Sequence, residues 1–376
     1  MVLRAWAADR LAPIEQVGSA LARVRTDPAS VTDDDWVALL GAAGDELDEL
    51  SALADAARAE VTGPDTFTFV VNRNLDTVAI SRVAALEELV AEAWELGATE
   101  VCLQGLLPAD AAADGYLRLI ERVHATEPAM HLHAFRPPEV RDAAARMGIT
   151  VTDFLARARD AGLGSVPGTA AQILDDEVRA ALHPTGSPDS VGSWIDTIEA
   201  AHGVGLFSTA TMLYGHLETP RQQVAHLRTI SEIAGRTDGF TELILMPMVP
   251  ENTPPHLRDV ATRTVSVRET RAVHAVARLI TVGRIDHLQV AWTKLERDIV
   301  VDLLRGGADD IGGLLLDGTL CPGAGQEAGR TLGVVDLHEI GERIGRRPRQ
   351  RTTAYDSPPA ERRISLPDNV VVRVPR

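Results

Sequence analysis

The chain has 376 residues, of which 45% are hydrophobic and 24% are charged, and its formal net charge is −17. This composition is typical of a globular protein with a large core. The negative charge argues against a nucleic-acid partner, because phosphates need a basic surface. No run of about eighteen apolar residues occurs, so we expect no membrane-spanning segment. The N-terminal residues lack a secretory signal pattern. The two cysteines give no disulfide framework, so a cytoplasmic location is expected.

A helical pattern opens the chain. Residues 32–60 carry apolar side chains at helical spacing, and Thr32 or Asp33 can cap the start of this region. We therefore place an N-terminal helical extension at residues 1–62.

Strand-like and helix-like runs alternate over residues 63–347. The strand-like runs are 66–71, 99–105, 130–135, 163–168, 206–212, 241–247, 286–292 and 309–316. The helix-like runs are 82–96, 110–126, 138–160, 188–203, 220–236, 264–281, 295–305 and 334–346. This alternation predicts an α/β fold, a (β/α)8 barrel of the TIM type. A doubly wound sheet is the alternative, but no glycine-rich dinucleotide fingerprint follows the first strand. Residues 348–376 are rich in proline and arginine and predict a C-terminal tail on the surface.

Reactive groups of such barrels sit at the carboxyl ends of the strands. Polar residues on or after the predicted strands are therefore the candidates for a functional site. They are Asn72, Arg73, Asn74, Gln104, His131, His133, Glu139, Thr169, Thr209, Thr211, Tyr214, His216, Glu218, Gln289, Trp292, Lys294, Asp309 and Asp310.

Several motifs identify a family. They are GLGSVPGTAAQILDDEVR (162–179), STATMLYGHLET (208–219), LQVAWTKL (288–295), GADDIGG (307–313) and PRQRTTAY (348–355). From about residue 35 to 355 the chain resembles the CofH-like half of FO synthase. This half is the 5-amino-6-(D-ribitylamino)uracil–tyrosine 4-hydroxyphenyl transferase of deazaflavin biosynthesis, in the radical S-adenosylmethionine superfamily. Menaquinone enzymes of the futalosine route are more distant relatives. The resemblance implies a barrel that holds a four-iron cluster and S-adenosylmethionine, and that joins a tyrosine-derived fragment to a ribityl-diaminouracil.

The chain departs from this family where the cluster would bind. The family carries a C-x3-C-x2-C loop after the first strand, whereas here VVNRNLDTVAI passes directly into SRVAALEEL between Ile80 and Ser81. Cys102 and Cys321 are the chain's two cysteines, and they are too far apart in sequence to replace a cluster loop. We therefore expect no bound metal and the loss of the four-iron cluster.

Three further departures concern the cofactor and the substrate. The family's QGG-x-HP turn becomes Gln104-Gly105-Leu106-Leu107-Pro108, so a leucine side chain stands where the family's glycine approaches S-adenosylmethionine. The family's GGTLMEE becomes GGLLLDG, which loses a carboxylate at Gly318, and a PDK-like segment becomes Pro184-Thr185-Gly186. We expect S-adenosylmethionine binding to be lost as well.

The individual candidates keep alternative interpretations. His131 and His133 alternate on a strand and share one face, where they form either a metal pair or a polar pocket wall. Asp309 is a general acid or a turn residue before the last strand. Lys294, the single lysine of the chain, is an anchor for an anionic group or a solvated side chain. Cys102 is predicted to be buried, and the 346–351 stretch is predicted to be a solvated tail.

We predict that the ligand-binding residues are polar side chains retained from the family. They are Asn72, Arg73, Gln104, His131, His133, Thr209, Tyr214, His216, Gln289, Trp292 and Lys294. The candidate catalytic residues are His216, Glu218 and Asp309.

Three functional hypotheses follow. The first is a pseudoenzyme barrel that binds a deazaflavin-pathway or related aromatic ligand without radical chemistry, as a homodimer or as a partner subunit of an intact FO synthase. The second is an enzyme with cluster-independent chemistry in the same pocket. The third is a structural subunit, which a pocket filled by Leu106 and residues 314–316 would favour. FO synthase-type transferase activity by similarity is a further alternative, so enzymatic status stays open.

Overall fold

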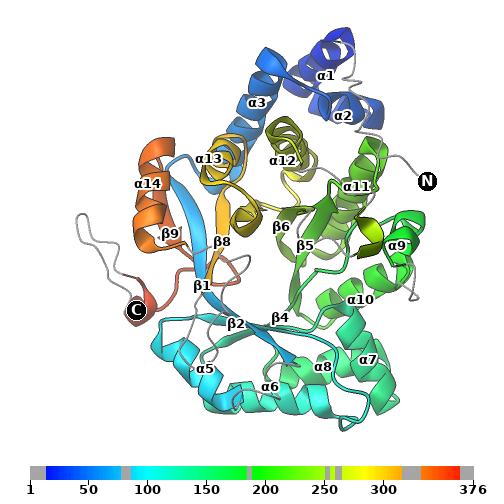
Figure 1. Cartoon of the computed structure of the whole chain (residues 1–376), viewed down its shortest axis with the longest axis vertical. Helices are drawn as coiled ribbons and strands as arrows, with labels where there is room; N and C mark the ends of the chain where they lie inside the picture. Colours follow the sequence, from blue (N-terminus) through cyan, green and yellow to red (C-terminus); the bar gives the residue numbers. More distant parts are fainter. Residues whose placement is uncertain are drawn as a thin grey trace. The chain divides into compact units, whose positions relative to one another are not determined.

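The computed structural model describes residues 14–77, 86–183, 189–249, 255–258, 265–315 and 332–364. Parallel strands follow the order β2-β3-β4-β5-β6-β7-β8-β1-β9, and β1 also pairs with β2, which closes an eight-stranded barrel (Figure 1). The predicted TIM-type fold is confirmed. The strands are β1 (Thr66–Asp76), β2 (Glu100–Gln104), β3 (His131–Ala134), β4 (Ser165–Val166), β5 (Phe207–Tyr214), β6 (Phe240–Pro247), β7 (His287–Val290), β8 (Asp310–Leu315) and β9 (Arg347–Gln350).

Helices connect the strands as the alternation predicts. The N-terminal extension contains α1 (Ile14–Thr26), α2 (Asp33–Leu39) and α3 (Gly44–Thr62). The barrel helices are α5 (Leu86–Glu95), α6 (Gly115–Thr126), α7 (Pro137–Met147), α8 (Val151–Ala161), α9 (Asp176–Leu182), α10 (Val191–Gly203), α11 (Pro220–Thr237), α12 (Val267–Thr281), α13 (Arg297–Arg305) and α14 (Val334–Ile344). Short 3-10 helices are η2 (Pro28–Ser30), η4 (Pro255–Leu257), η5 (Trp292–Lys294) and η6 (Ala360–Arg362).

Two predicted helical regions are each divided in two. Thr32 caps α2 through a capping box with Asp35, as expected, but the 32–60 region breaks before Gly44, whose φ is +54°. The 138–160 region breaks at Gly148, a left-handed C-cap with φ of +64°. Both breaks use glycine where the backbone is left-handed, a conformation that disfavours other residues.

The segment after residue 346 corrects the prediction of a solvated tail. Arg347–Gln350 forms β9, which pairs in parallel with the start of β1. Arg351 is 1% exposed and Thr353 is 3% exposed. The segment therefore contributes buried polar groups to the barrel, and residues 365–376 lie outside the described residues.

The chain divides into two compact units. The first comprises residues 1–64, 171–193 and 210–310, and the second comprises residues 65–170, 194–209 and 311–376. Each unit is described by itself below. None of the helices in the described ranges has the length and apolar character that a bilayer crossing demands.

Candidate functional site

In the second unit, one face of strands β1 to β4 is lined by polar side chains. Arg73 points to the other face, where it pairs with Glu92 of α5 at 2.7 Å and donates to the Leu89 carbonyl. Side chains alternate along a strand, so Asn72 lies on the face turned away from α5, here called the inner face. Strand register places Asn72 beside Glu100, and Glu100 beside His131. Arg73, a predicted ligand-binding residue, is therefore not brought to this face.

Ser165 lies between two imidazoles on the inner face. Its Oγ is 2.7 Å from His131 Nε2 and 2.6 Å from His133 Nδ1. The His131 ring also stacks on Phe207 of β5, with ring centroids 5.6 Å apart. The predicted placement of His131 and His133 on one face of their strand is confirmed.

A glycine makes room for this pair. A β carbon on Gly164 would lie 2.4 Å from His131 Cε1, inside any permissible contact. A glycine precedes Ser165 in the GLGSVPG motif because any larger residue would clash with the His131 ring.

Glu100 is the charged member of the same face. Its carboxylate accepts hydrogen bonds from the Thr353 hydroxyl, from Cys102 Sγ at 3.2 Å and from Asn72 Nδ2 at 3.4 Å. Burial raises the pKa of Glu100, but the neighbouring imidazoles, which attract the carboxylate in their protonated form at acid pH, and these bonds outweigh burial and hold the pKa below its usual range. Cys102 is buried, as predicted.

The two imidazoles are neutral at pH 7. Burial lowers the pKa of His133 to about 4 against the attraction of Glu100, and burial also lowers the pKa of His131. Asn72 Oδ1 is buried without a hydrogen-bond partner in the described part of the chain. A β carbon on Gly313 would lie 2.0 Å from this oxygen, so the glycine of the DDIGG motif leaves it space.

The carboxyl ends of β1 and β2 carry the altered glycine turn. Gly105 has φ of +124°, and a β carbon there would lie 2.3 Å from Thr77 Oγ1. Leu106, at the altered position, is 52% exposed. Leu107 is held by its backbone N–H, which donates to Tyr116 Oη at 3.0 Å. Within the described ranges, the buried hydroxyls of Thr77 and Thr169 have no hydrogen-bond partner.

In the first unit, the side chains of His216 and Glu218 form hydrogen bonds within the turn that follows β5. Glu218 accepts bonds from the backbone N–H groups of Gly215 and His216, and from Gln223 Nε2 at 2.8 Å. His216 Nε2 bonds the Leu213 carbonyl at 2.8 Å, and both side chains are buried. The geometry gives these two candidate catalytic residues a role in shaping the turn.

Tyr214, another predicted ligand-binding residue, faces a helix. Its hydroxyl lies 3.4 Å from Thr270 Oγ1, and its ring makes an edge contact with His274, both on α12. Burial raises the pKa of Tyr214 above its ordinary value.

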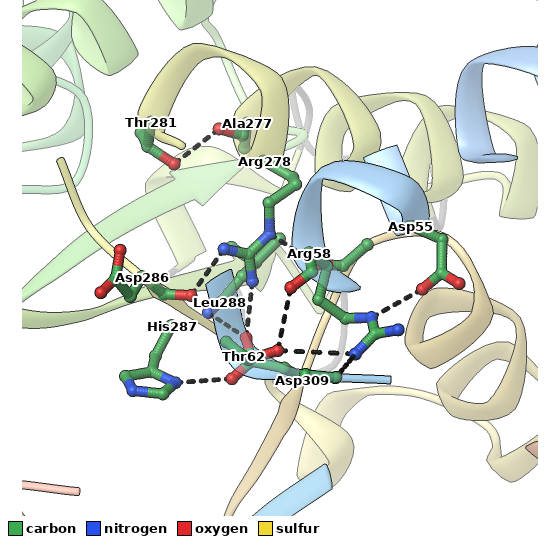
Figure 2. A network of polar contacts seen from close by, with 12 residues as sticks. Asp55, Arg58, Thr62, Ala277, Arg278, Thr281, Asp286, His287, Leu288 and Asp309 are labelled. Atoms are coloured by element: carbon green, nitrogen blue, oxygen red, sulfur yellow. Dashed lines mark hydrogen bonds and ion pairs between the residues drawn. The ribbon is translucent and has the colours of Figure 1, made fainter. Parts of the chain in front are cut away.

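Asp309 lies at the amino end of β8, because the strand begins at Asp310. Figure 2 shows its carboxylate between Arg278 of α12 at 2.5 Å and His287 of β7 at 2.6 Å. The Leu288 N–H donates to it at 2.8 Å, and Arg278 also bonds the Gly307 and Asp286 carbonyls. His216 follows the carboxyl end of β5, so the structure does not bring Asp309 to it. The structure thus places Asp309 just before β8, as in the alternative of a turn residue before the last strand, and not at a carboxyl strand end.

The remaining predicted residues are spread over several elements. Thr209 accepts a bond from the Gly168 N–H at 3.0 Å. Gln104 is half-buried at the end of β2, and Gln289 is half-buried on β7 in register with buried Asp310. Trp292 is buried and Lys294 half-buried in η5, which follows β7. Glu139 is buried in the capping box of α7.

Some predictions concern residues outside the described ranges. They are the junction between Ile80 and Ser81, the 184–186 segment, Leu316, Gly318 and Cys321.

Sequence reasoning missed Ser165, Glu100 and Thr353. A signal existed in the Glu-x-Cys-x-Gln alternation of β2, which puts Glu100, Cys102 and Gln104 on one face. Ser165 is a single polar residue between Gly164 and Val166, and nothing in the local pattern marks it.

A metal centre needs several ligating side chains close together. Among the described residues, no three histidine, cysteine or acidic side chains are grouped as metal ligands. Cys102 directs its thiol at Glu100. The described residues thus do not fit a four-iron cluster, which needs several thiolates together.

The chain is similar to curated proteins over most of its length. It is 42% identical over 362 residues to the FO synthase of Mycobacterium leprae, covering 90% of this chain and 41% of that protein. It is 36% identical over 327 residues to 5-amino-6-(D-ribitylamino)uracil–L-tyrosine 4-hydroxyphenyl transferase 1 of Methanosarcina barkeri, covering 82% of this chain and 86% of that protein. The chain thus spans about two fifths of the length of the FO synthases it matches.

Solved structures share the fold. The FeFe-hydrogenase maturase HydG of Carboxydothermus hydrogenoformans superposes with a TM-score of 0.65 at 14% identity, over 91% of this chain and 81% of that one. Methylornithine synthase superposes with a TM-score of 0.60 at 17% identity, over 88% of this chain and 97% of that one. No protein-family model matches the chain.

Proposed function

The chain belongs to the family of the 5-amino-6-(D-ribitylamino)uracil–L-tyrosine 4-hydroxyphenyl transferases, and on this premise we propose that it binds a deazaflavin-pathway or related aromatic ligand in its barrel without radical chemistry. It is in this sense a pseudoenzyme of the family.

The cysteine content is the observation that carries this proposal. Radical chemistry in the family depends on a four-iron cluster held by a three-cysteine loop, and the chain contains two cysteines in total. One of these, Cys102, is buried on β2 and bonded to Glu100. A cluster has no ligand set here, so S-adenosylmethionine loses the iron that binds its methionyl group.

The inner face of the second unit supports a retained ligand site. TIM barrels commonly fill their interior with layers of branched apolar side chains. Here Asn72, Glu100, His131, His133 and Ser165 occupy that face instead. Burying a polar group without a partner costs about 1–3 kcal/mol. A barrel kept only as a scaffold gains nothing from an orphaned Asn72 oxygen.

Leu106 supports the same proposal over a structural subunit. A leucine that filled the vacated cofactor position would be buried, whereas Leu106 is half exposed. The backbone N–H of the neighbouring Leu107 is bonded to Tyr116, which holds the turn in place. The Leu106 side chain therefore faces solvent from an ordered turn.

Anaerobic reconstitution with iron and sulfide tests the absence of radical chemistry. The purified protein is expected to retain no stoichiometric iron, and calorimetry is expected to detect no micromolar S-adenosylmethionine binding. About four irons per chain after desalting, or formation of the 4-hydroxyphenyl transfer product, would overturn the proposal in favour of transferase activity.

A thermal-shift screen tests the ligand. S-adenosylmethionine, tyrosine, 5-amino-6-(D-ribitylamino)uracil and deazaflavins are compared, since a ligand at 100 times its dissociation constant stabilises a protein by about 2.7 kcal/mol. We expect the ribityl-uracil or a deazaflavin to raise the melting temperature. Turnover of any bound compound without iron would favour cluster-independent chemistry, and no stabilisation by any compound would contradict ligand binding.

The proposal extends to a protein partner. The chain corresponds in length to part of an FO synthase, which supports association with an intact FO synthase or with a second copy of itself. Sedimentation of the chain alone and with an FO synthase separates these two states, and a monomer in both experiments would remove this extension.

A further inference from the structure

Ser165 bridges two imidazoles with a single hydroxyl hydrogen. A serine hydroxyl has one donor and can also accept. Both distances to its oxygen, 2.7 Å from His131 Nε2 and 2.6 Å from His133 Nδ1, are hydrogen bonds. Burial keeps both rings neutral at pH 7. If Ser165 accepted an N–H from both rings, its own hydrogen would have no partner within the described residues. We therefore take Ser165 to donate to one ring and to accept an N–H from the other.

This constraint links the tautomers of the two rings. If Ser165 donates to His133 Nδ1, then His133 carries its hydrogen on Nε2, and His131 must also carry its hydrogen on Nε2 to donate to Ser165. If Ser165 donates to His131 Nε2 instead, both rings carry their hydrogens on Nδ1. In each case the two remaining nitrogens, His131 Nδ1 and His133 Nε2, have opposite roles, one as donor and one as acceptor.

We infer that Ser165 is a specificity-determining positioning residue that holds His131 and His133 in the same tautomer. Ligand groups that reach the two remaining nitrogens must then be one donor and one acceptor, in either order. Two donors or two acceptors are disfavoured, because one bond would be left unmade. The recognition part of this inference rests on the proposed function, whereas the tautomer linkage does not.

The surroundings of the pair hold it in place. The His131 ring stacks on Phe207, and the absence of a β carbon on Gly164 lets the ring occupy this position. The stack favours the orientation in which the ring faces Ser165. The His133 ring is buried beside the Glu100 carboxylate. For both histidines, the bond to Ser165 is the side-chain hydrogen bond found within the described ranges, and the second nitrogen of each ring has no hydrogen-bond partner there.

Nitrogen-15 NMR of histidine-labelled protein tests the linkage. The two rings are assigned among the 11 histidines of the chain by comparing the spectra of His131→Gln and His133→Gln. In the wild-type protein without ligand, we expect both rings to show the same tautomer. One ring with its hydrogen on Nδ1 and the other with it on Nε2 would overturn the inference.

The serine variants sharpen the test. Ser165→Ala is expected to release the linkage, so that the two rings adopt independent tautomers. Ser208→Ala is the matched control, because Ser208 bonds His202 Nε2 at 2.8 Å from the opposite face of β5. It should leave His131 and His133 unchanged. Tautomers that stay linked in folded Ser165→Ala would show that another group sets them and would overturn the role of Ser165.

A ligand titration separates this inference from the proposed function. With 5-amino-6-(D-ribitylamino)uracil as the probe, Ser165→Ala is expected to bind about tenfold more weakly than wild type, and Ser208→Ala as well as wild type does. If neither the probe nor the other pathway compounds bind wild type, the proposed function fails. The NMR measurement of the wild-type tautomers then still tests whether Ser165 links the two rings. Equal probe affinity in Ser165→Ala and wild type would contradict the positioning role.

Discussion

The network around Asp309 in the first unit and the network around Ser165 in the second are both buried, but they differ in how completely their hydrogen bonds are used. Asp309 is bonded by Arg278, His287 and the Leu288 N–H, and Arg278 also donates to two backbone carbonyls (Figure 2). Around Ser165, each imidazole keeps one nitrogen for a further bond, and the Asn72 oxygen nearby has no partner within the described residues.

This difference separates two uses of buried polar groups. A completed network fixes the backbone segments that it joins, and its loss is felt as lost stability. An incomplete network costs free energy until water or a ligand completes it. By this criterion Asp309 belongs to a structural network and Ser165 to a candidate ligand-binding set. Glu218 and Tyr214 are intermediate, because His216 Nδ1, Gln223 Oε1 and His274 Nε2 beside them have no hydrogen-bond partner within the described residues.

Substitution of Asp309 is expected to change the free energy of unfolding most. Asp309→Ala leaves the buried Arg278 guanidinium without its carboxylate, so the free energy of unfolding in urea should fall by about 3–5 kcal/mol. Ligand affinity of the folded fraction should not change. A variant of wild-type stability that has lost ligand binding would place Asp309 in the ligand site.

The free energy of unfolding should also depend on pH through Asp309. The neighbouring His287 and Arg278 hold the pKa of Asp309 below its ordinary value of 3.8 despite burial. The stability it contributes is present above pH 3.8 and is lost as the pH falls through the lower folded-state value. Asp309→Asn should lack this acid transition in urea unfolding measured from pH 5 to 2, and an unchanged acid transition would contradict the account.

Glu218 is expected to have the next largest effect. Glu218→Ala removes the acceptor of two backbone N–H groups and of Gln223. Each unpaired group costs about 1–3 kcal/mol, so the free energy of unfolding should fall by about 3 kcal/mol. Thr219→Ala, which removes the neighbouring cap of α11, is the matched control at about 1 kcal/mol. Intact stability together with lost ligand binding would return Glu218 to the candidate catalytic residues.

His133, a candidate ligand-binding histidine, can be compared with His226, whose two ring nitrogens are both bonded within the protein. Burial lowers the folded-state pKa of His133 to about 4 and that of His226 to about 3, both from 6.5. The unfolded chain therefore takes up protons first, and stability falls as the pH drops from 6.5 towards these values. His133→Gln and His226→Gln should each reduce this acid loss by roughly 1–3 kcal/mol between pH 7 and 4.5.

Ligand affinity distinguishes these two variants. His226 bonds the Leu174 N–H and the Thr211 carbonyl with its two nitrogens, so neither is left for a ligand. His226→Gln should bind the ligand as wild type does. Weaker binding in His226→Gln than in His133→Gln would reverse the assignment of the two histidines.

Tyr214 is expected to give the smallest effect. Its hydroxyl bond to Thr270 is long, at 3.4 Å, and its ring packs against α12. Tyr214→Phe should change the free energy of unfolding by less than about 1 kcal/mol and leave ligand affinity unchanged. A tenfold loss of affinity would mean that the hydroxyl reaches the ligand.

The sequence predicted the fold well because strand-like and helix-like runs alternate without interruption. The eight predicted strands all correspond to observed ones, and the shared face of His131 and His133 followed from simple alternation. The strand ends were harder to predict. The first strand continues to Asp76, and the last barrel strand begins at Asp310, so Asp309 lies at the amino end.

The face of a strand could not be predicted where both faces are buried. Arg73 and Tyr214 lie on strands whose residues are almost all buried, whichever face they occupy, and periodicity does not distinguish helix-facing from inner positions there. Thr353 reaches Glu100 from more than 250 residues away, a contact that local sequence does not encode. The candidate site was therefore predicted in part, through His131, His133 and Asn72, and it lacked Ser165 and Glu100.

Calorimetric titration of iron-free protein with 5-amino-6-(D-ribitylamino)uracil decides whether the barrel binds a ligand without a cluster. We expect wild type and Tyr214→Phe to bind with the same affinity and His133→Gln to bind at least about tenfold more weakly. Equal affinity in His133→Gln and wild type, or binding by wild type only after a cluster has been installed, would contradict ligand binding at His133 without a cluster.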